Sequence, residues 1–434
     1  MDQPSTEDAG LKLLTSPPVF DSLYAFCSPG DLCCVAKTCN GASQAVTNYL
    51  THSVTIDLSR LLLRFFTSQE EILDFRRLQA KHQFLISGSA ALQLLDRTTY
   101  PNSDLDLYLF PHDAEVVGRW LIEHGYTFSP YRRGKKTFEE ALEAMPLPRT
   151  ELDNDELHER TPYGLPGVRA VLNFKKVTKR DLGLLPVTSS PGAPRYHFAE
   201  AKTAEIQLII ADVTPYEAIL KFHTTVVMNI ITWDRAIALF PLGTLEQRRG
   251  IVTHNASWSF DRCVDKYADR GFSFLKPLAR FKEDFERGPF RFGPRFFGDE
   301  HSWVVKLDTT GIEPPEIPVA VEGNSWELEW DDAYDCFALR AERLDWSMVH
   351  HKYCISDSFL AYIIALYESF NKPENAGQYT QFFDSDPDLR LAKLSSDDKA
   401  SYNSGKDVQV LSLLLRHFRD AREADLLAER LKHL

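Results

Sequence analysis

The chain has 434 residues, of which 44% are hydrophobic and 26% are charged. This composition is typical of a globular protein, and the length allows two or three domains with a sizeable core. The 49 basic and 62 acidic residues give a net charge of −13, which argues against broad, non-specific binding to nucleic acid.

The seven cysteines form no Cys-x-x-Cys pair, and the four between Cys27 and Cys39 have no histidine at zinc-ligand spacing. We therefore expect reduced, mostly buried thiols and a cytoplasmic or nuclear protein. The acidic, polar N-terminus is unlike a signal peptide, and no apolar run approaches a membrane span in length. We expect no association with a membrane.

After a lead at residues 1–15 that we expect to be disordered, the N-terminal region is predicted to be helical. Apolar residues recur at helical spacing from Leu23 to Val35, and Ser28-Pro29-Gly30-Asp31 predicts a turn that caps a second helix. Val54–Leu58 predicts a short strand, and Glu70–Ala80 predicts a charged helix.

The helical segment at residues 16–60 resembles an F-box over residues 17–50. Ser28-Pro29-Gly30-Asp31-Leu32 matches the turn into the second F-box helix, and Ala36-Lys37-Thr38-Cys39 matches the Cys-containing third segment. Pro17-Pro18-Val19-Phe20 replaces the usual Leu-Pro start, and the later Trp is absent. The resemblance implies an apolar surface for a Skp-family adaptor. The alternative is a plain helical hairpin that packs on the rest of the chain.

Residues 84–110, FLISGSAALQLLDRTTYPNSDLDLYLF, predict a buried strand, a Gly-Ser turn, a short helix and a second strand. Asp104 and Asp106 belong to the second strand, and side chains two residues apart on a strand point to the same face. Mg²⁺ favours one or two carboxylates with phosphate oxygens and waters. Backbone N–H groups after Gly88-Ser89, at the start of the helix, can bind a phosphate. The stretch therefore predicts a metal-nucleotide site.

Further along the chain, helices and strands alternate. We expect helices from Asp113 to Gly125 and from Thr214 to about Trp233, strands at 167–174 and 205–210, and an exposed, charged insertion at 129–165. Residues 244–287, 355–371 and 406–434 have helical patterns, so residues 241–434 are predicted to be a mainly helical C-terminal region.

The strand–Gly-Ser–helix–strand order resembles the nucleotidyltransferase fold of the DNA polymerase β superfamily. Leu85-Ile86-Ser87-Gly88-Ser89 matches the family's strand and turn, and Ser103-Asp104-Leu105-Asp106-Leu107 matches its Asp-x-Asp strand, with 14 residues between Ser89 and Asp104. The stretch is also similar to abortive-infection type nucleotidyltransferases and to a group of filamentous-fungal proteins with this fold. The resemblance implies an α/β (α+β) domain at residues 61–240, with a mixed sheet flanked by helices, that binds Mg²⁺ through Asp104 and Asp106.

Active members of this superfamily usually carry a third carboxylate on a later strand. The strand Glu205-Ile206-Gln207-Leu208-Ile209 is the candidate, and its matching position is Gln207, which is neither a base nor a charged ligand. Glu205 lies on the same face two residues earlier and is the expected substitute, unless it is an ordinary exposed charge. Asn173 on the neighbouring strand is polar but neutral.

Other residues are weaker candidates for binding. The resemblance places Lys221 and His223 where triphosphate- or base-contacting groups are found, although both also fit a solvated helix face. Arg97 either contacts a phosphate or pairs with Asp96 or Asp104. Arg132-Arg133-Gly134-Lys135-Lys136 suggests an RNA acceptor or a charged loop tip, and His350-His351 with Cys354 lacks a fourth metal ligand.

Two functions follow from these patterns. The first is a transferase that moves a nucleoside monophosphate from a nucleoside triphosphate to an acceptor hydroxyl, with nucleic acid considered only as an acceptor. The second is a binding or adaptor protein on a nucleotidyltransferase scaffold that has lost activity, which the F-box-like segment and Gln207 favour.

Overall fold

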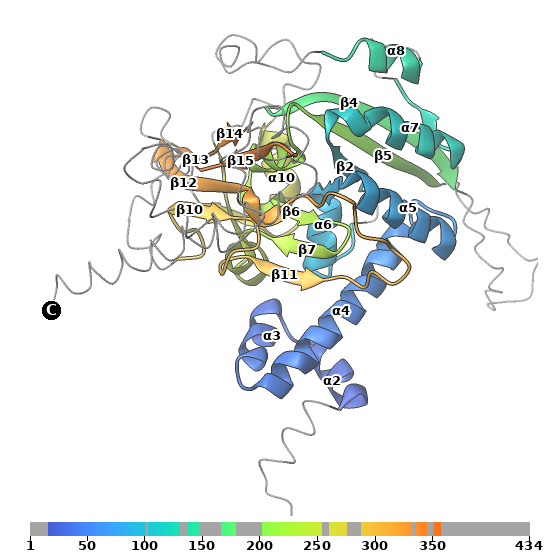
Figure 1. Cartoon of the computed structure of the whole chain (residues 1–434). Helices are drawn as coiled ribbons and strands as arrows, with labels where there is room; N and C mark the ends of the chain where they lie inside the picture. The colour runs from blue at the N-terminus through green and yellow to red at the C-terminus, as the bar shows by residue number, and fades with distance from the viewer. Residues whose placement is uncertain are drawn as a thin grey trace, which may run out of the picture.

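A computed structural model describes residues 16–100, 103–130, 137–146, 166–178, 202–253, 260–275, 288–331, 336–344 and 350–356. In this part of the chain, a central eight-stranded sheet is flanked by helices, and three smaller sheets lie beside it (Figure 1). The predicted class, a mixed sheet with flanking helices, is confirmed at this level.

The central sheet has the strand order β11-β7-β6-β1-β2-β5-β4-β3. Strands β2 and β5 are parallel, whereas all other neighbours in this sheet are antiparallel. Its strands are β1 (Leu85–Ser87), β2 (Leu105–Leu109), β3 (Thr127–Phe128), β4 (Val168–Thr178), β5 (Lys202–Ala211), β6 (Asn229–Ile231), β7 (Arg235–Ala238) and β11 (Trp303–Lys306). Since β11 completes the sheet, the sheet extends beyond the predicted domain boundary at residue 240.

Helices pack on one face of this sheet, where the inward residues of β2 are Leu105, Leu107 and Leu109. The other face carries Tyr108 and Ile209 and packs against α9 (Pro215–Leu220) and parts of the smaller sheets. The helices of the first face are α4 (Asn40–Leu62), α5 (Gln69–His82), α6 (Gly88–Leu95) and α7 (Ala114–Glu123). Period-2 alternation along β2 thus separates two hydrophobic clusters.

The described part of the C-terminal region contains mostly strands, which corrects the prediction of a mainly helical region. Between residues 241 and 356 its only α-helix is α10 (Phe260–Ala268), with the single π-helical turn η4 (Leu242–Glu246) and the 3-10 turn η5 (Val321–Gly323). Besides β11, the strands are β8 (Arg249–Ile251), β9 (Ser273–Leu275), β10 (Gly293–Phe296), β12 (Ser325–Asp331), β13 (Cys336–Arg340), β14 (Glu342–Leu344) and β15 (Tyr353–Ile355). They are short and separated by Gly- and Pro-rich segments, so the alternation of apolar and polar residues is too brief to predict strands from the sequence. The helices predicted at 355–371 and 406–434 lie almost entirely outside the described residues.

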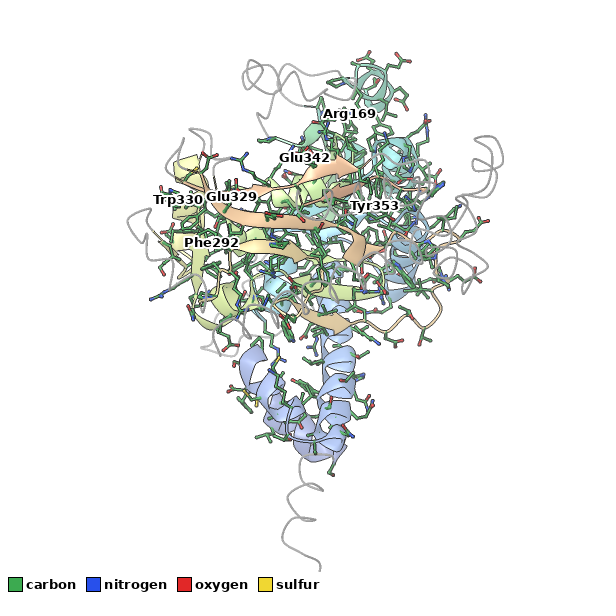
Figure 2. The ribbon with its side chains drawn as sticks, turned by 60° about the vertical axis from the view of Figure 1, so that its left-hand side comes forward. Arg169, Phe292, Glu329, Trp330, Glu342 and Tyr353 are labelled. Atoms are coloured by element: carbon green, nitrogen blue, oxygen red, sulfur yellow. The ribbon has the colours of Figure 1, made fainter. Side chains whose placement is uncertain are left out.

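Figure 2 brings this side of the molecule forward, with Trp330 on β12, Glu342 on β14 and Tyr353 on β15. Tyr353 is fully buried, and its hydroxyl accepts a hydrogen bond from the backbone N–H of Ala320. Trp326 of β12 is also fully buried, in the cluster that covers the second face of the central sheet. The smaller sheets are therefore part of the same core.

The N-terminal segment forms α2 (Pro17–Tyr24), α3 (Pro29–Ala36) and the long α4, and the first two helices extend away from the sheet with the start of α4 (Figure 1). The Ser28 hydroxyl accepts a hydrogen bond from the Asp31 N–H, and the Asp31 carboxylate accepts one from the Ser28 N–H. This capping box confirms the predicted turn and helix start. The strand predicted at Val54–Leu58 is wrong, because both residues lie on the buried side of α4, four positions apart.

A second correction concerns the helix predicted from Thr214 to Trp233. Helix α9 begins after Thr214 as expected but ends at Leu220. A 3-10 turn, η3 (Thr225–Val227), follows, and the chain then enters the sheet as β6. Its apolar residues match a helical period, but the β-branched run from Thr224 to Val227 and at Ile230-Ile231 favours extended structure.

The remaining predicted elements agree with the structure, since α5, α7, β4 and β5 occupy their predicted positions. Within the predicted insertion at 129–165, the structure describes the short helix α8 (Phe138–Glu143), whose Phe138 packs on Gly118. The basic cluster Arg132–Lys136 and the lead at residues 1–15 lie outside the described residues.

Glu246 joins the projecting helices to the body, because its carboxylate accepts hydrogen bonds from the Ser28 hydroxyl at 3.0 Å and the Gly30 N–H at 2.6 Å. We expect Glu246→Ala to lower the free energy of unfolding by about 2 kcal/mol, since hydrogen bonds to a charged group are lost and the start of α3 loses a negative partner. Limited proteolysis should cut the N-terminal helices faster in this variant. Glu115→Ala, at an exposed ion pair on α7, is the control; equal cleavage in both variants would contradict the role of Glu246.

Candidate functional site

The two predicted metal-binding carboxylates lie together at the N-terminal end of β2, inside the central sheet. Asp104 immediately precedes β2, and Asp106 lies on β2 with its side chain on the same face as Tyr108. In the sheet, Asp106 is directly opposite Ser87 of β1 and Gln207 of β5. The pairing therefore brings the Gly-Ser turn, the Asp-x-Asp pair and the later strand to one place.

Gly88 is in direct contact with the Asp106 carboxylate. It has a φ of +64°, and a Cβ atom at this position would lie 2.5 Å from Asp106 Oδ2. Glycine is required for both reasons, since other residues rarely adopt this φ and have a side chain that would displace the carboxylate. Ser89, in the first turn of α6, is 5% exposed. The predicted phosphate turn is thus next to the carboxylates and is partly covered by Asp106.

Burial and mutual repulsion disfavour charge on this pair. Burial raises the pKa of Asp104, and the nearby Glu205 raises it further, while Lys266, Lys175 and Arg64 oppose the shift. The pKa of Asp106 is raised to about 7, first by burial and then by the Asp104 charge. Two carboxylates that are costly to ionise together gain most from a divalent cation, so the pair fits the carboxylate share of a Mg²⁺ site.

Gln207, the residue that the resemblance matches with a third carboxylate, lies on β5 directly opposite Asp106. Gln207 Nε2 lies 3.5 Å from Asp104 Oδ2 and directs a weak hydrogen bond to it, and Asn173 is opposite Gln207 on β4. Glu205 is near enough to raise the pKa of Asp104, and its own carboxylate accepts a hydrogen bond from Lys175 Nζ at 2.7 Å. Glu205 is therefore a charged neighbour of the pair that is held by a lysine of the next strand.

Sequence reasoning missed two basic residues at this site. Arg64, at the end of α4, donates hydrogen bonds to the backbone oxygens of Tyr100 and Ser103 and so fixes the turn that leads into Asp104. Lys266 of α10 is exposed, and its charge lowers the pKa values of both Asp104 and Asp106. Both residues are far from Asp104 in the sequence, so no local motif could have identified them.

His223 also faces Lys266, which together with burial lowers the pKa of its imidazole to about 4. Its Nε2 atom is buried and has no hydrogen-bond partner among the described residues. It lies beyond the end of α9, not on a solvated helix face. His223 is therefore a neutral ring at neutral pH, on the side of the site that α10 covers.

Arg97 has a different role from the predicted phosphate contact. Its Nη1 atom donates hydrogen bonds to the backbone oxygens of Tyr24 and Cys27 at 3.3 Å, and its guanidinium lies over the ring of Tyr49 at 5.7 Å. These contacts attach the N-terminal helices to the end of α6. None of them involves Asp104 or Asp106, so the structure does not bring Arg97 into the site.

Lys221 is also directed away from the carboxylates. Its Nζ atom lies 2.6 Å from Glu217 Oε1, and its side chain packs on Gly167 near the C-terminal end of β5. Gln207 lies four residues earlier on β5 than Ala211, which corresponds to about 13 Å along a strand. Lys221 therefore lies near the opposite end of β5 from the carboxylates.

No other cluster in the described residues has the geometry of a metal site. In this part of the chain no group of three or more His, Cys, Asp and Glu side chains is arranged to hold a metal ion. Cys354 is fully buried, and its thiol donates a hydrogen bond to the Asn324 side chain, so the sulfur is engaged away from solvent. Among the same residues, no helix is both long and apolar enough to cross a membrane.

Comparison with known proteins adds no relative. The chain matches no known protein family, no curated protein and no solved structure at a significant level.

The raised pKa of Asp106 predicts a pH-dependent stability. In the unfolded chain an aspartate loses its proton near pH 4, whereas folded Asp106 retains it to about pH 7, so this residue makes the fold less stable as the pH rises from 4 to 7. We expect Asp106→Asn to raise the free energy of unfolding at pH 8 by on the order of 2 kcal/mol, with the gain disappearing toward pH 4. Thermal denaturation at pH 4, 6 and 8 measures this difference.

The matched control is Asp57→Asn, at an exposed carboxylate of α4 that pairs with Arg60. A gain in stability that is equal at all pH values, or equal in both variants, would refute the assigned shift.

Proposed function

We propose that this protein is a Mg²⁺-dependent nucleotidyltransferase of the DNA polymerase β type, which transfers a nucleoside monophosphate from a nucleoside triphosphate to an acceptor hydroxyl. The proposal rests mainly on the placement of Asp104 and Asp106, which share one face of β2 beside the Gly88 turn. The antiparallel β1–β2 pair and the parallel β2–β5 pair support it, because they place the residues of the family motif at one sheet edge.

Asp104 and Asp106 would hold the metal, and Mg²⁺ would supply charge neutralisation for the phosphates and the leaving pyrophosphate. Lys266, exposed on α10, adds positive charge near both carboxylates, which favours the binding of phosphates there. Arg64 keeps Asp104 in position through the turn at Ser103. Positioning and charge neutralisation are the two main requirements of this chemistry.

In the reaction, the acceptor oxygen forms a bond to the α-phosphorus while the bond from that phosphorus to the pyrophosphate oxygen breaks. The hydroxyl proton needs an acceptor, and Gln207 cannot take it. Glu205 is the charged carboxylate that we assign to this role, since it is close to Asp104 and lies on the same face of β5. Its carboxylate forms an ion pair with Lys175 at 2.7 Å. The transfer would therefore be slower than with a carboxylate at position 207.

A direct test is nucleotide turnover by the whole chain with Mg²⁺ and each of ATP, GTP, CTP and UTP. We expect Asp104→Ala to reduce turnover by at least about a thousandfold, since one of the two carboxylate ligands is lost. Pyrophosphate release measures turnover, and calorimetry measures Mg²⁺-dependent nucleotide binding.

Asp57→Ala is the control for the loss of a carboxylate. Gln207→Glu provides a gain-of-function arm, because a carboxylate opposite Asp106 should tighten Mg²⁺ binding and raise turnover. Wild-type protein that binds none of the four nucleotides with Mg²⁺, or full turnover in Asp104→Ala, would exclude the enzyme.

The second candidate is a catalytically inactive scaffold that acts as an F-box-type adaptor. It is favoured by the exposed side chains at the end of α2, where Leu23 is 43% and Phe26 is 93% exposed, on helices that extend from the body (Figure 1). Such a surface suits a helical Skp-family partner.

For this adaptor we expect a purified Skp-family protein to bind the chain and the double substitution Leu23→Ala/Phe26→Ala to weaken binding at least about tenfold. Val116→Ala, at an exposed apolar residue of α7, is the control. Lack of binding to the wild-type chain in surface plasmon resonance would eliminate the adaptor.

A further inference from the structure

A cavity of about 840 Å³ lies at the other end of β2 from the carboxylates. The turn after β2, from Phe110 to Asp113, forms part of its wall, together with the last turns of α5. Phe110 follows Asp104 by six residues, which corresponds to about 20 Å along an extended strand. The cavity is therefore separate from the proposed transferase site, and it has the volume typical of a small-molecule pocket.

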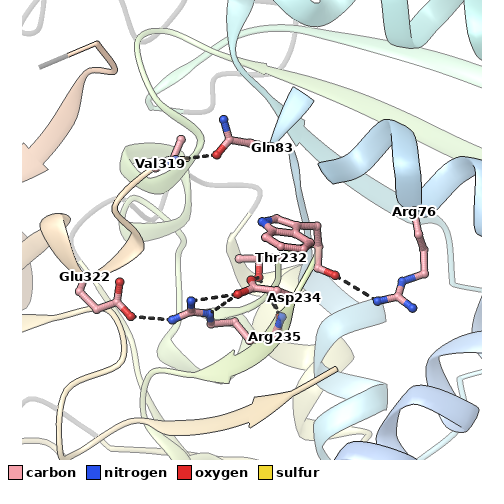
Figure 3. A network of polar contacts seen from close by, with 8 residues as sticks. Arg76, Gln83, Thr232, Asp234, Arg235, Val319 and Glu322 are labelled. Carbon is pink, nitrogen blue, oxygen red and sulfur yellow. Dashed lines mark hydrogen bonds and ion pairs between the residues drawn. The ribbon is translucent and has the colours of Figure 1, made fainter. Parts of the chain in front are cut away.

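The outer wall is the segment at residues 311–317, which specific contacts hold against the C-terminal half of α5. Gln83 Nε2 donates to the Ile317 carbonyl at 2.8 Å, and Gln83 Oε1 accepts from the Val319 N–H at 2.5 Å, the latter visible in Figure 3. Arg77 Nε donates to the Gly311 carbonyl at 2.8 Å. Contacts at both ends keep this wall in place, so the cavity is formed without a ligand.

The floor of the cavity presents nearly parallel rings. Phe110 is buried, and its ring stacks with His112 at 5.7 Å and 22° and lies at 5.8 Å and 31° from His351. The His112 side chain is 72% exposed, so one face of its ring is open to the solvent. A flat ring that stacks on this imidazole would extend the existing stack.

Several charged side chains lie next to these rings, and they differ in whether they already form ion pairs. Asp113 is buried and binds His82 Nδ1 at 2.7 Å, and Arg77 pairs with Asp74. Lys81 is exposed, and no ion pair of Lys81 occurs within the described residues. The ammonium group of Lys81 is thus an available cation beside the aromatic floor, suited to a phosphate or carboxylate.

We propose that this cavity is a second ligand site, for a small molecule that joins a flat heteroaromatic ring to an anionic group, as a nucleoside monophosphate does. The ring stacks on His112, and the anionic group pairs with Lys81. Glu313 and Glu316 also line the cavity, but both are exposed, so water screens their repulsion of the anion. The site does not depend on the proposed transferase activity.

Calorimetry with AMP, adenosine and inorganic phosphate tests the two halves of this ligand. The full-length Asp104→Ala variant in EDTA is used, so that metal-dependent binding at the other site does not contribute. We expect AMP to bind at least about tenfold more tightly than adenosine or phosphate, because only AMP uses both contacts. Lys81→Ala should weaken AMP binding about tenfold without changing adenosine binding, whereas His112→Ala should weaken both.

Lys37→Ala, at an exposed lysine of the N-terminal helices, is the matched control for charge. The double substitution Glu313→Gln/Glu316→Gln tests the sign of the ligand and should strengthen AMP binding about two- to threefold. The proposal is overturned if AMP does not bind, or if AMP affinity survives both Lys81→Ala and His112→Ala. It is equally overturned if putrescine binds instead and the Glu313→Gln/Glu316→Gln protein loses that binding.

Discussion

The contact between Asp106 and Gly88 constrains much of the structure around it. The Asp106 carboxylate occupies the space in which any other residue at position 88 would place its Cβ atom. The chain turns directly from β1 into α6 at Gly88, and β1 pairs with β2 so that Ser87 is opposite Asp106. This register brings the Asp106 carboxylate onto the turn. Because β2 also pairs with β5, the same register brings Gln207 and Glu205 to the carboxylates.

The cost of this arrangement is electrostatic, since two carboxylates are brought together in a partly buried place. The surrounding residues compensate for only part of the cost. Lys266 and Arg64 supply positive charge, and Gln207 directs a neutral amide toward Asp104. When no cation is bound, a glutamine here avoids the repulsion that a third carboxylate would add. Unlike a carboxylate, however, it cannot accept a proton. For the proposed transfer, the carboxylate that could accept the proton is Glu205, which is paired with Lys175.

The two ends of β2 serve different parts of the molecule. The carboxylates lie at its N-terminal end, and the cavity lined by Phe110 and Lys81 lies beyond its C-terminal end. The sheet between them is closed on one face by α4 to α7 and on the other by α9 and the smaller sheets. Arg97 and Glu246 use their charges to attach the projecting N-terminal helices to this body. Those contacts explain why Arg97 is absent from the candidate site.

The sequence by itself determined the local features that short spacing encodes. The capping box at Ser28, the strand–glycine–helix order at Gly88 and the shared face of Asp104 and Asp106 each depend on residues within a few positions of one another. The position of Gln207 was also foreseeable, because strand alternation places it on a definite face. Periodicity failed where one segment fitted two periods. Val54–Leu58 is helical because α4 buries one long apolar stripe, and the chain leaves the helix after Leu220 because β6 pairs between β1 and β7 in the sheet.

Only the tertiary structure decided the partners that come from distant parts of the chain. Lys266 of α10 brings positive charge to both carboxylates, and Arg64, just after α4, holds the turn that leads into Asp104. The cavity beside Phe110 is formed from four separated segments, none of which has a motif of its own. The physical reason is the same in each case. Tertiary packing determines which side chain lies beside a buried charge or closes a cavity, and the spacing of residues in the sequence does not encode these contacts.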